Sequence, residues 1–152
     1  MYFPFSGESL YDSGLHPLSV PFTMAHELAH GFGWTHEGDC NFIAYLACTR
    51  SSDPAIRYAA EFNYWRYLLA SYHSMDPKGF KSYKSSLSHF LLEDLEAVRE
   101  KHDKYPEFLP AFRSWFYDHY LSYHKIKGGA RAYSDIVRML IIYKLKKASV
   151  NY

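Results

Sequence analysis

Residues 24 to 42 read MAHELAHGFGWTHEGDCNF and hold more potential metal ligands than one site needs. Within them, His26, Glu27 and His30 form the pattern His-Glu-x-x-His. Residues i and i+4 of an α-helix lie on one face, so the two imidazoles can reach one zinc ion. Zinc lowers the pKa of a bound water to about 7, and Glu27 is the general base that takes its proton. The pattern therefore predicts zinc-dependent hydrolysis of peptide bonds.

Three residues that follow the histidine pair are candidates for the third zinc ligand: His36, Glu37 and Asp39. His36 completes the metzincin string His-Glu-x-x-His-x-x-Gly-x-x-His, in which a glycine lets the chain turn and the last histidine reach back. Asp39 stands where we expect a second helix to begin, and a carboxylate placed there is the gluzincin solution. It is also a good N-cap residue, and the two roles can coexist. The residues alone leave these alternatives open.

The neighbours of the motif are apolar, as expected for a buried metal helix: Met24, Ala25, Leu28 and Ala29. Two surface histidines with a capping glutamate would need polar residues at positions 28 and 29, where the sequence has Leu28 and Ala29. A purely structural zinc site has no need of a general base, so Glu27 favours a metallopeptidase. The alternative is a non-catalytic, zinc-stabilised module that binds a peptide or a membrane partner.

The predicted architecture is one all-α domain over residues 1–152, with a short extended segment followed by a loop in the first 20 residues. The motif helix opens near Pro21 and ends near Gly31 and Gly33. A second helix begins at about Asp39 and ends at about Cys48. Further helices are predicted at about 53–73, 77–86, 88–103, 107–123 and 134–147, the last with Ile136, Met139, Leu140 and Ile142 in the core.

Composition and cysteine spacing exclude several classes of protein. The formal net charge of +1 argues against a nucleic-acid binder, which would carry a basic stripe. There is no run of 18 apolar residues and no signal-peptide layout, so we expect this chain on its own to be soluble. Cys40 and Cys48 lie two helical turns apart, about 12 Å along an axis, which is too far for a disulfide. We expect both to be small buried hydrophobes.

Several stretches together resemble a bacterial family of zincin-like membrane proteins known as a domain of unknown function. They are YFPFSGES at 2–9, PFTMAHELAHGFGW at 21–34, GDCNFIAYLAC at 38–48 and the segment 129–134. The corresponding family texts run close to YFPFTGEAN, PFTxAHExAHxxGF, ExEANFxAYLAC and Gly-x-x-Ser-Tyr-Gly. The resemblance covers nearly the whole chain and implies a gluzincin-like zinc metallopeptidase that acts on a peptide or protein substrate.

This resemblance ranks the candidate residues. The family's glutamate in Glu-Ala-Asn falls on Asp39, and a similar carboxylate is the third zinc ligand in the ImmA/IrrE-type peptidases. Asp39 is therefore the preferred third ligand, ahead of His36 and Glu37. Aspartate is one methylene shorter than glutamate, so its helix has to approach the metal more closely. Tyr133, by the match to Ser-Tyr, is a candidate hydrogen-bond donor to the oxyanion of the tetrahedral intermediate, with a packed core tyrosine as the alternative.

The resemblance also implies a link to a membrane. Family members begin with transmembrane helices and a further segment before YFPF, so we expect this chain to be a C-terminal part that is membrane-associated only in the complete protein. Glu8 matches the family's Gly-Glu and is a candidate for lining the cleft at an edge strand, where an extended peptide could add. A loop carboxylate is the alternative for Glu8. Loss of part of the cleft would leave an inert domain.

Overall fold

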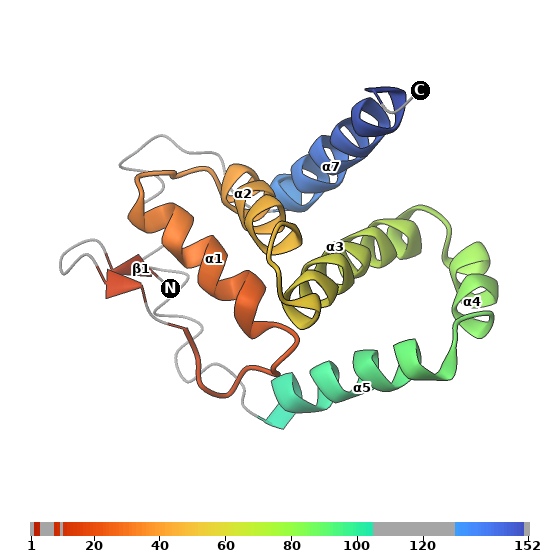
Figure 1. Cartoon of the computed structure of the whole chain (residues 1–152). Helices are drawn as coiled ribbons and strands as arrows, with labels where there is room; N and C mark the ends of the chain where they lie inside the picture. The colour runs from red at the N-terminus through yellow and green to blue at the C-terminus, as the bar shows by residue number, and fades with distance from the viewer. Residues whose placement is uncertain (1, 4–7, 10, 105–129, 151–152) are drawn as a thin grey trace.

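The computed structural model describes the backbone of residues 2–3, 8–9, 11–104 and 130–150, and the side chains of residues 11–104 and 136–149. Within these residues the fold is all-α, as predicted, with a short extended piece at its start (Figure 1). That piece is an antiparallel pair of strands, β1 (Tyr2–Phe3) and β2 (Glu8–Ser9), which lie against the helix that carries the motif. The helix predicted over 107–123 lies outside the described residues.

Six helices are described, and most begin close to where their capping residues predict. Asp53 accepts a hydrogen bond from the Ala55 amide at 2.8 Å, and Asp76 accepts one from the Gly79 amide at 2.9 Å. In both cases a proline follows at the first helical position, where its missing N–H costs nothing. The helices are α1 (Val20–Gly31), α2 (Glu37–Thr49), α3 (Pro54–Met75), α4 (Pro77–Ser85), α5 (His89–Lys104) and α7 (Ala130–Val150).

The start of α2 differs from the prediction by two residues. Its first helical residue is Glu37, its N-cap is His36, and the Cys40 amide donates to the His36 carbonyl at 3.0 Å. Asp39 therefore neither begins nor caps the helix. Glu37 and Asp39 both lie in the first turn, where the positive end of the helix dipole stabilises carboxylates.

One core joins α1, α2, α3 and α7, and Figure 1 shows α1, α2 and α3 side by side with α7 next to α2. The prediction that Ile136 and Leu140 are core residues is confirmed, because both side chains are fully buried. Ile142 was also expected in the core, but its side chain is 46% exposed. The buried cluster consists of Phe22, Ala44, Tyr45, Cys48, Ala60, Tyr64, Ile136 and Leu140.

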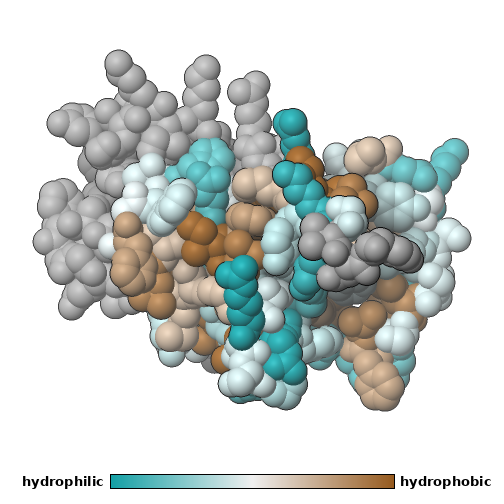
Figure 2. Space-filling view, turned by 45° about the horizontal axis from the view of Figure 1, so that its top comes forward, coloured by the Kyte–Doolittle hydropathy of each residue, from teal (hydrophilic) through white to brown (hydrophobic). Residues whose placement is uncertain are grey.

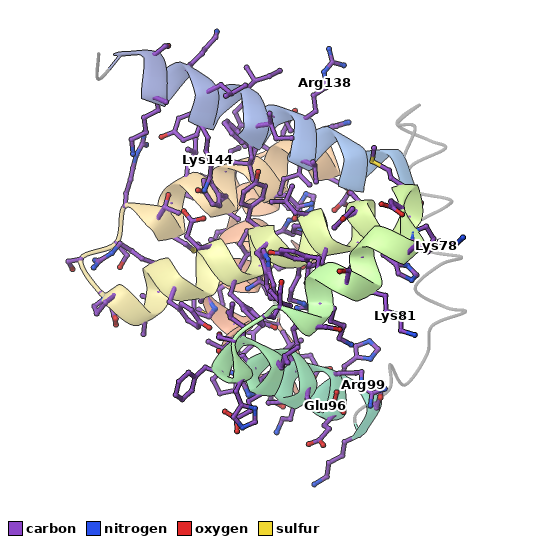
Figure 3. The ribbon with its side chains drawn as sticks, turned by 90° about the vertical axis from the view of Figure 1, so that its right-hand side faces the viewer. Lys78, Lys81, Glu96, Arg99, Arg138 and Lys144 are labelled. Atoms are coloured by element: carbon purple, nitrogen blue, oxygen red, sulfur yellow. The ribbon has the colours of Figure 1, made fainter. Side chains whose placement is uncertain are left out.

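A polar clamp adds to this apolar contact between α7 and its neighbours. In Figure 3, Lys144 points from α7 toward the adjoining helices, whereas Arg138 of the same helix points away. Lys144 Nζ donates to Glu61 Oε2 at 2.8 Å, and the Tyr45 hydroxyl donates to Glu61 Oε1 at 2.7 Å. Burial and the bond to Glu61 raise the pKa of Tyr45, so its hydroxyl stays protonated and keeps donating. The clamp therefore links α7, α3 and α2.

Two further helices continue the chain beyond this core. Aromatic rings hold α4 to α3, with Tyr72 5.9 Å from Tyr83 and 6.2 Å from Phe80 between ring centroids. The Tyr58 hydroxyl of α3 donates to Asp94 of α5. Neither helix supplies a member of the histidine and carboxylate cluster described below.

The surface shown in Figure 2 alternates between hydrophobic patches and hydrophilic side chains. On the side seen in Figure 3, Lys78 and Lys81 extend outward from α4, and Arg99 lies beside Glu96 on α5. In the part of the chain that the structure describes, no helix combines the length and the apolar character needed to cross a membrane.

The core position of Leu140 can be tested by unfolding. Leu140→Ala should lower the free energy of unfolding by about 2–5 kcal/mol, because it leaves a cavity at a fully buried site. Leu145→Ala is the matched control on the same helix, since the Leu145 side chain is 66% exposed, and it should change stability by less than about 0.5 kcal/mol. Equilibrium urea unfolding followed by circular dichroism gives both values. Equal losses would contradict this packing of α7.

Candidate metal centre

Three side chains from two helices converge at one point. His26 and His30 on α1 place their Nε2 atoms 3.1 Å apart. Glu37, at the start of α2, places Oε2 3.3 Å from His26 Nε2 and Oε1 3.4 Å from His30 Nε2. The side chains of His26, His30 and Glu37 are 14%, 10% and 23% exposed, so the cluster is mostly shielded from solvent. Among the described residues this is the one group of three or more such ligands that could hold a metal ion.

The spacing of these atoms matches the requirements of zinc. In a tetrahedral site with Zn–N and Zn–O distances of about 2.0–2.1 Å, two ligand atoms are separated by about 3.3–3.4 Å. The three separations in the cluster, 3.1, 3.3 and 3.4 Å, lie close to that value. Two neutral imidazoles and one carboxylate are also a common ligand set of catalytic zinc, which leaves one position for water or substrate. The residues present therefore fit the ion.

The turn after α1 carries a backbone group that orients His30. The Gly33 amide donates to the His30 carbonyl at 2.9 Å and the Trp34 amide to the Ala29 carbonyl at 3.2 Å, which is the Schellman pattern. Gly33 has φ +95, a left-handed conformation that glycine adopts without strain. The reversal brings the Trp34 carbonyl to 2.8 Å from His30 Nδ1. Nδ1–H then donates to this carbonyl, which leaves Nε2 as the ligating atom.

Charge around His30 is balanced by its neighbours. Burial lowers the pKa of an imidazole, but contacts with the Cys40 and Glu37 side chains and the Trp34 carbonyl outweigh burial and raise the pKa of His30 to about 10. Since a ligating imidazole is neutral, metal binding at Nε2 competes with protonation of the ring.

His26 is held differently from His30. Its Nδ1 is buried, and no hydrogen-bond partner for that atom is found among the described residues. Its ring packs edge-on against the His30 ring, with centroids 4.7 Å apart and planes at 80°. His26 is therefore held by ring packing and by the contacts of its Nε2 with His30 and Glu37, whereas His30 also has a backbone hydrogen bond at Nδ1.

The structure brings Glu37 to the histidine pair in place of Asp39, the ligand preferred from the sequence. Each residue turns an α-helix by about 100°, so Asp39 lies about 200° round the axis of α2 from Glu37. Glu37 shares its face with the buried residues Cys40 and Asn41, whereas the Asp39 side chain is 42% exposed. His36, the other alternative, is also 42% exposed, and its Nδ1 lies 3.7 Å from Asp39 Oδ1. The sequence ranks Glu37 behind both Asp39 and His36.

A sequence signal for Glu37 exists in the register of α2. Its buried positions recur at helical spacing toward α1 and the core: Gly38, Cys40, Asn41, Ala44, Tyr45 and Cys48. Counting back from Cys40 and Asn41 by three and four residues leads to Glu37 and not to Asp39. If the helix is expected to start at Asp39, Glu37 lies outside it and its place on this face is overlooked.

Glu27 lies half-buried on α1 beside the ligands. By helical geometry it is about 100° from His26 and about 60° from His30, so all three occupy less than a third of the helix circumference. A glutamate beside two histidines on one helix face is the arrangement typical of a general base in zinc hydrolases. Tyr133 belongs to α7, but its side chain lies outside the described part of the chain, as does that of Glu8 in β2.

The solvent side of α1 is more exposed than the buried metal helix expected from the sequence. Ala29 is buried, but Met24 and Leu28 are 43% and 51% exposed. In the turn that follows, Phe32 is 84% exposed and Trp34 is 51% exposed. The apolar context of the motif therefore splits into a core side and an exposed apolar side.

The choice of Glu37 over Asp39 can be tested by zinc affinity. Glu37→Gln should weaken zinc binding by more than the roughly 10–100-fold that follows loss of a residue that only orients a ligand. Asp39→Asn removes the same charge from the same helical turn and should leave the affinity within about threefold, because Asp39 lies off the ligand face. Competition with a chromophoric chelator measures both affinities. A larger loss in Asp39→Asn would restore Asp39 as the ligand.

Comparison with known proteins identifies one family. A family model described as "Protein of unknown function (DUF3810)" matches residues 1–141. No curated protein and no solved structure matches the chain significantly.

Proposed function

The chain belongs to the DUF3810 family, and we propose that it is a zinc-dependent metallopeptidase whose metal ligands are His26, His30 and Glu37. The observation that carries this proposal is the convergence of two Nε2 atoms and one carboxylate at separations of 3.1, 3.3 and 3.4 Å. These atoms come from two helices, so the convergence is a tertiary feature and not only a sequence pattern.

The donor set favours zinc over calcium and magnesium. Two imidazole nitrogens and one carboxylate suit zinc, whereas calcium and magnesium prefer sites built from oxygen ligands alone. When bound, the ion supplies a Lewis acid and lowers the pKa of a water to about 7. The rest of the chemistry is assigned to side chains of this protein.

Each residue has a separate role. His26, His30 and Glu37 hold the ion, and the Trp34 carbonyl keeps His30 in the tautomer that ligates through Nε2. Glu27 accepts a proton from the attacking water and passes it to the leaving amine. The substrate class is a peptide or protein, because this pairing of a metal with an adjacent glutamate suits hydrolysis of an amide bond. Tyr133 remains a candidate oxyanion donor by resemblance.

Association of the complete protein with a membrane is a further part of the proposal. Its support is the resemblance carried by the YFPF, His-Glu and GDCNF stretches. The described helices supply no membrane span of their own.

The role of Glu27 separates catalysis from a structural use of zinc. Glu27→Gln should keep one zinc per chain and lower the rate of peptide cleavage by about 100-fold or more, which is the usual contribution of a general base. Zinc is measured by elemental analysis, and cleavage is measured on a mixture of unstructured peptides by mass spectrometry. Lys81→Gln, on the exposed side of α4, is the control and should change neither value.

Two outcomes would overturn this assignment. Cleavage by Glu27→Gln at the wild-type rate would remove Glu27 from the chemistry. A zinc-loaded wild-type protein that cleaves none of the peptides, but loses its fold when a chelator removes the metal, would favour a zinc-stabilised binding module.

A further inference from the structure

A buried thiol touches the group that orients His30. Cys40 is fully buried on α2, and its Sγ lies 3.4 Å from the Trp34 carbonyl oxygen and 3.4 Å from His30 Nδ1. Cys40 is free and does not take part in a disulfide, as predicted from its spacing to Cys48. The roles assigned above make no use of this thiol.

The geometry gives the thiol a donor role toward the carbonyl. A carbonyl oxygen has two lone pairs, so the Trp34 oxygen can accept from His30 Nδ1–H at 2.8 Å and from the Cys40 S–H at 3.4 Å. Cys40 cannot be a ligand in this arrangement, because it lies on the Nδ1 side of the His30 ring while the ligand atoms meet at Nε2.

We propose that Cys40 is a positioning residue that holds the Trp34 carbonyl against His30 Nδ1 and so fixes the tautomer and angle of a metal ligand. Glu37 and Cys40 are one turn apart on the same face of α2. One helical turn thus supplies the third ligand and also supports the orientation of the second. This inference rests on the proposed metal centre.

The chain contains a matched control for this thiol. Cys48 is also buried on α2, two turns further on, and its Sγ lies 3.5 Å from the Pro21 carbonyl, at the other end of α1 from the turn that holds Trp34. Burial raises the pKa of the Cys48 thiol, so it stays protonated. Removing either sulfur leaves a similar small cavity, but only the change at Cys40 removes a contact with Trp34.

The test compares zinc affinities of Cys40→Ala, Cys40→Ser and Cys48→Ala by chelator competition. Cys40→Ala should bind zinc about 10–100-fold more weakly, the usual effect of losing a group that orients a ligand. Cys40→Ser keeps a donor and should recover most of the affinity, and Cys48→Ala should match wild type. Equal losses in Cys40→Ala and Cys48→Ala, or no rescue by serine, would overturn the positioning role.

A second readout reports the ring directly. In the wild type, nitrogen-15 NMR of the His30 imidazole should show the Nδ1–H form in the zinc-loaded protein, and Cys40→Ala should broaden or shift that signal while Cys48→Ala does not. Cobalt substitution tests whether Cys40 is instead a metal ligand. A sulfur-to-cobalt charge-transfer band that disappears in Cys40→Ala would make Cys40 a ligand and contradict the proposal. Absence of zinc binding by the wild type would instead count against the metal centre itself.

Discussion

The site depends on one backbone reversal, the five-residue turn between α1 and α2. His26 and His30 are brought together by the helix that carries them, but Glu37 reaches them only because the chain doubles back at once. Gly33 allows this with φ +95, and among the described residues, its two chain neighbours aside, no atom lies within 4 Å of the position a Cβ would occupy there. The cost of a Cβ at this position would therefore come from the backbone conformation.

The same turn links the fold to the chemistry of the site. The Trp34 amide closes the end of α1, and the Trp34 carbonyl accepts from His30 Nδ1. The core holds the site helices further along their length, where Phe22 of α1 and Tyr45 of α2 are 4% and 3% exposed. The Tyr67 hydroxyl of α3 also donates to the buried Asn41 of α2 at 3.4 Å. The proposed ligands thus lie next to a core shared by four helices, which limits the movement of α2 relative to α1.

Features set by local periodicity could be predicted from the sequence. The histidine pair follows from the i, i+4 spacing, the end of α1 from its glycines, and the helical core from the apolar spacing that places Ile136 and Leu140. The third ligand was harder because it depends on where α2 begins. When the helix is expected to begin at Asp39, Glu37 falls outside it, and the place of Glu37 on the face of Cys40 and Asn41 is missed. Helix boundaries are often uncertain by one or two residues. The choice between Glu37 and Asp39 as third ligand is therefore uncertain when it is made from the sequence alone.

The contact between Trp34 and His30 could not be read from residue types at all. Its acceptor is a backbone carbonyl, which every residue has, and only the conformation of the turn selects Trp34. The role inferred for Cys40 also depends on the conformation of this turn. From the sequence alone, a small cysteine on α2 is expected only to fill space in the core.

Zinc-edge X-ray absorption of the purified, zinc-loaded chain tests the proposed centre most directly. If His26, His30 and Glu37 are the ligands, the first shell consists of nitrogen and oxygen at about 2.0–2.1 Å, with imidazole scattering from two histidines and one zinc per chain. A sulfur shell at about 2.3 Å, the scattering of a single imidazole, or substoichiometric zinc would contradict it.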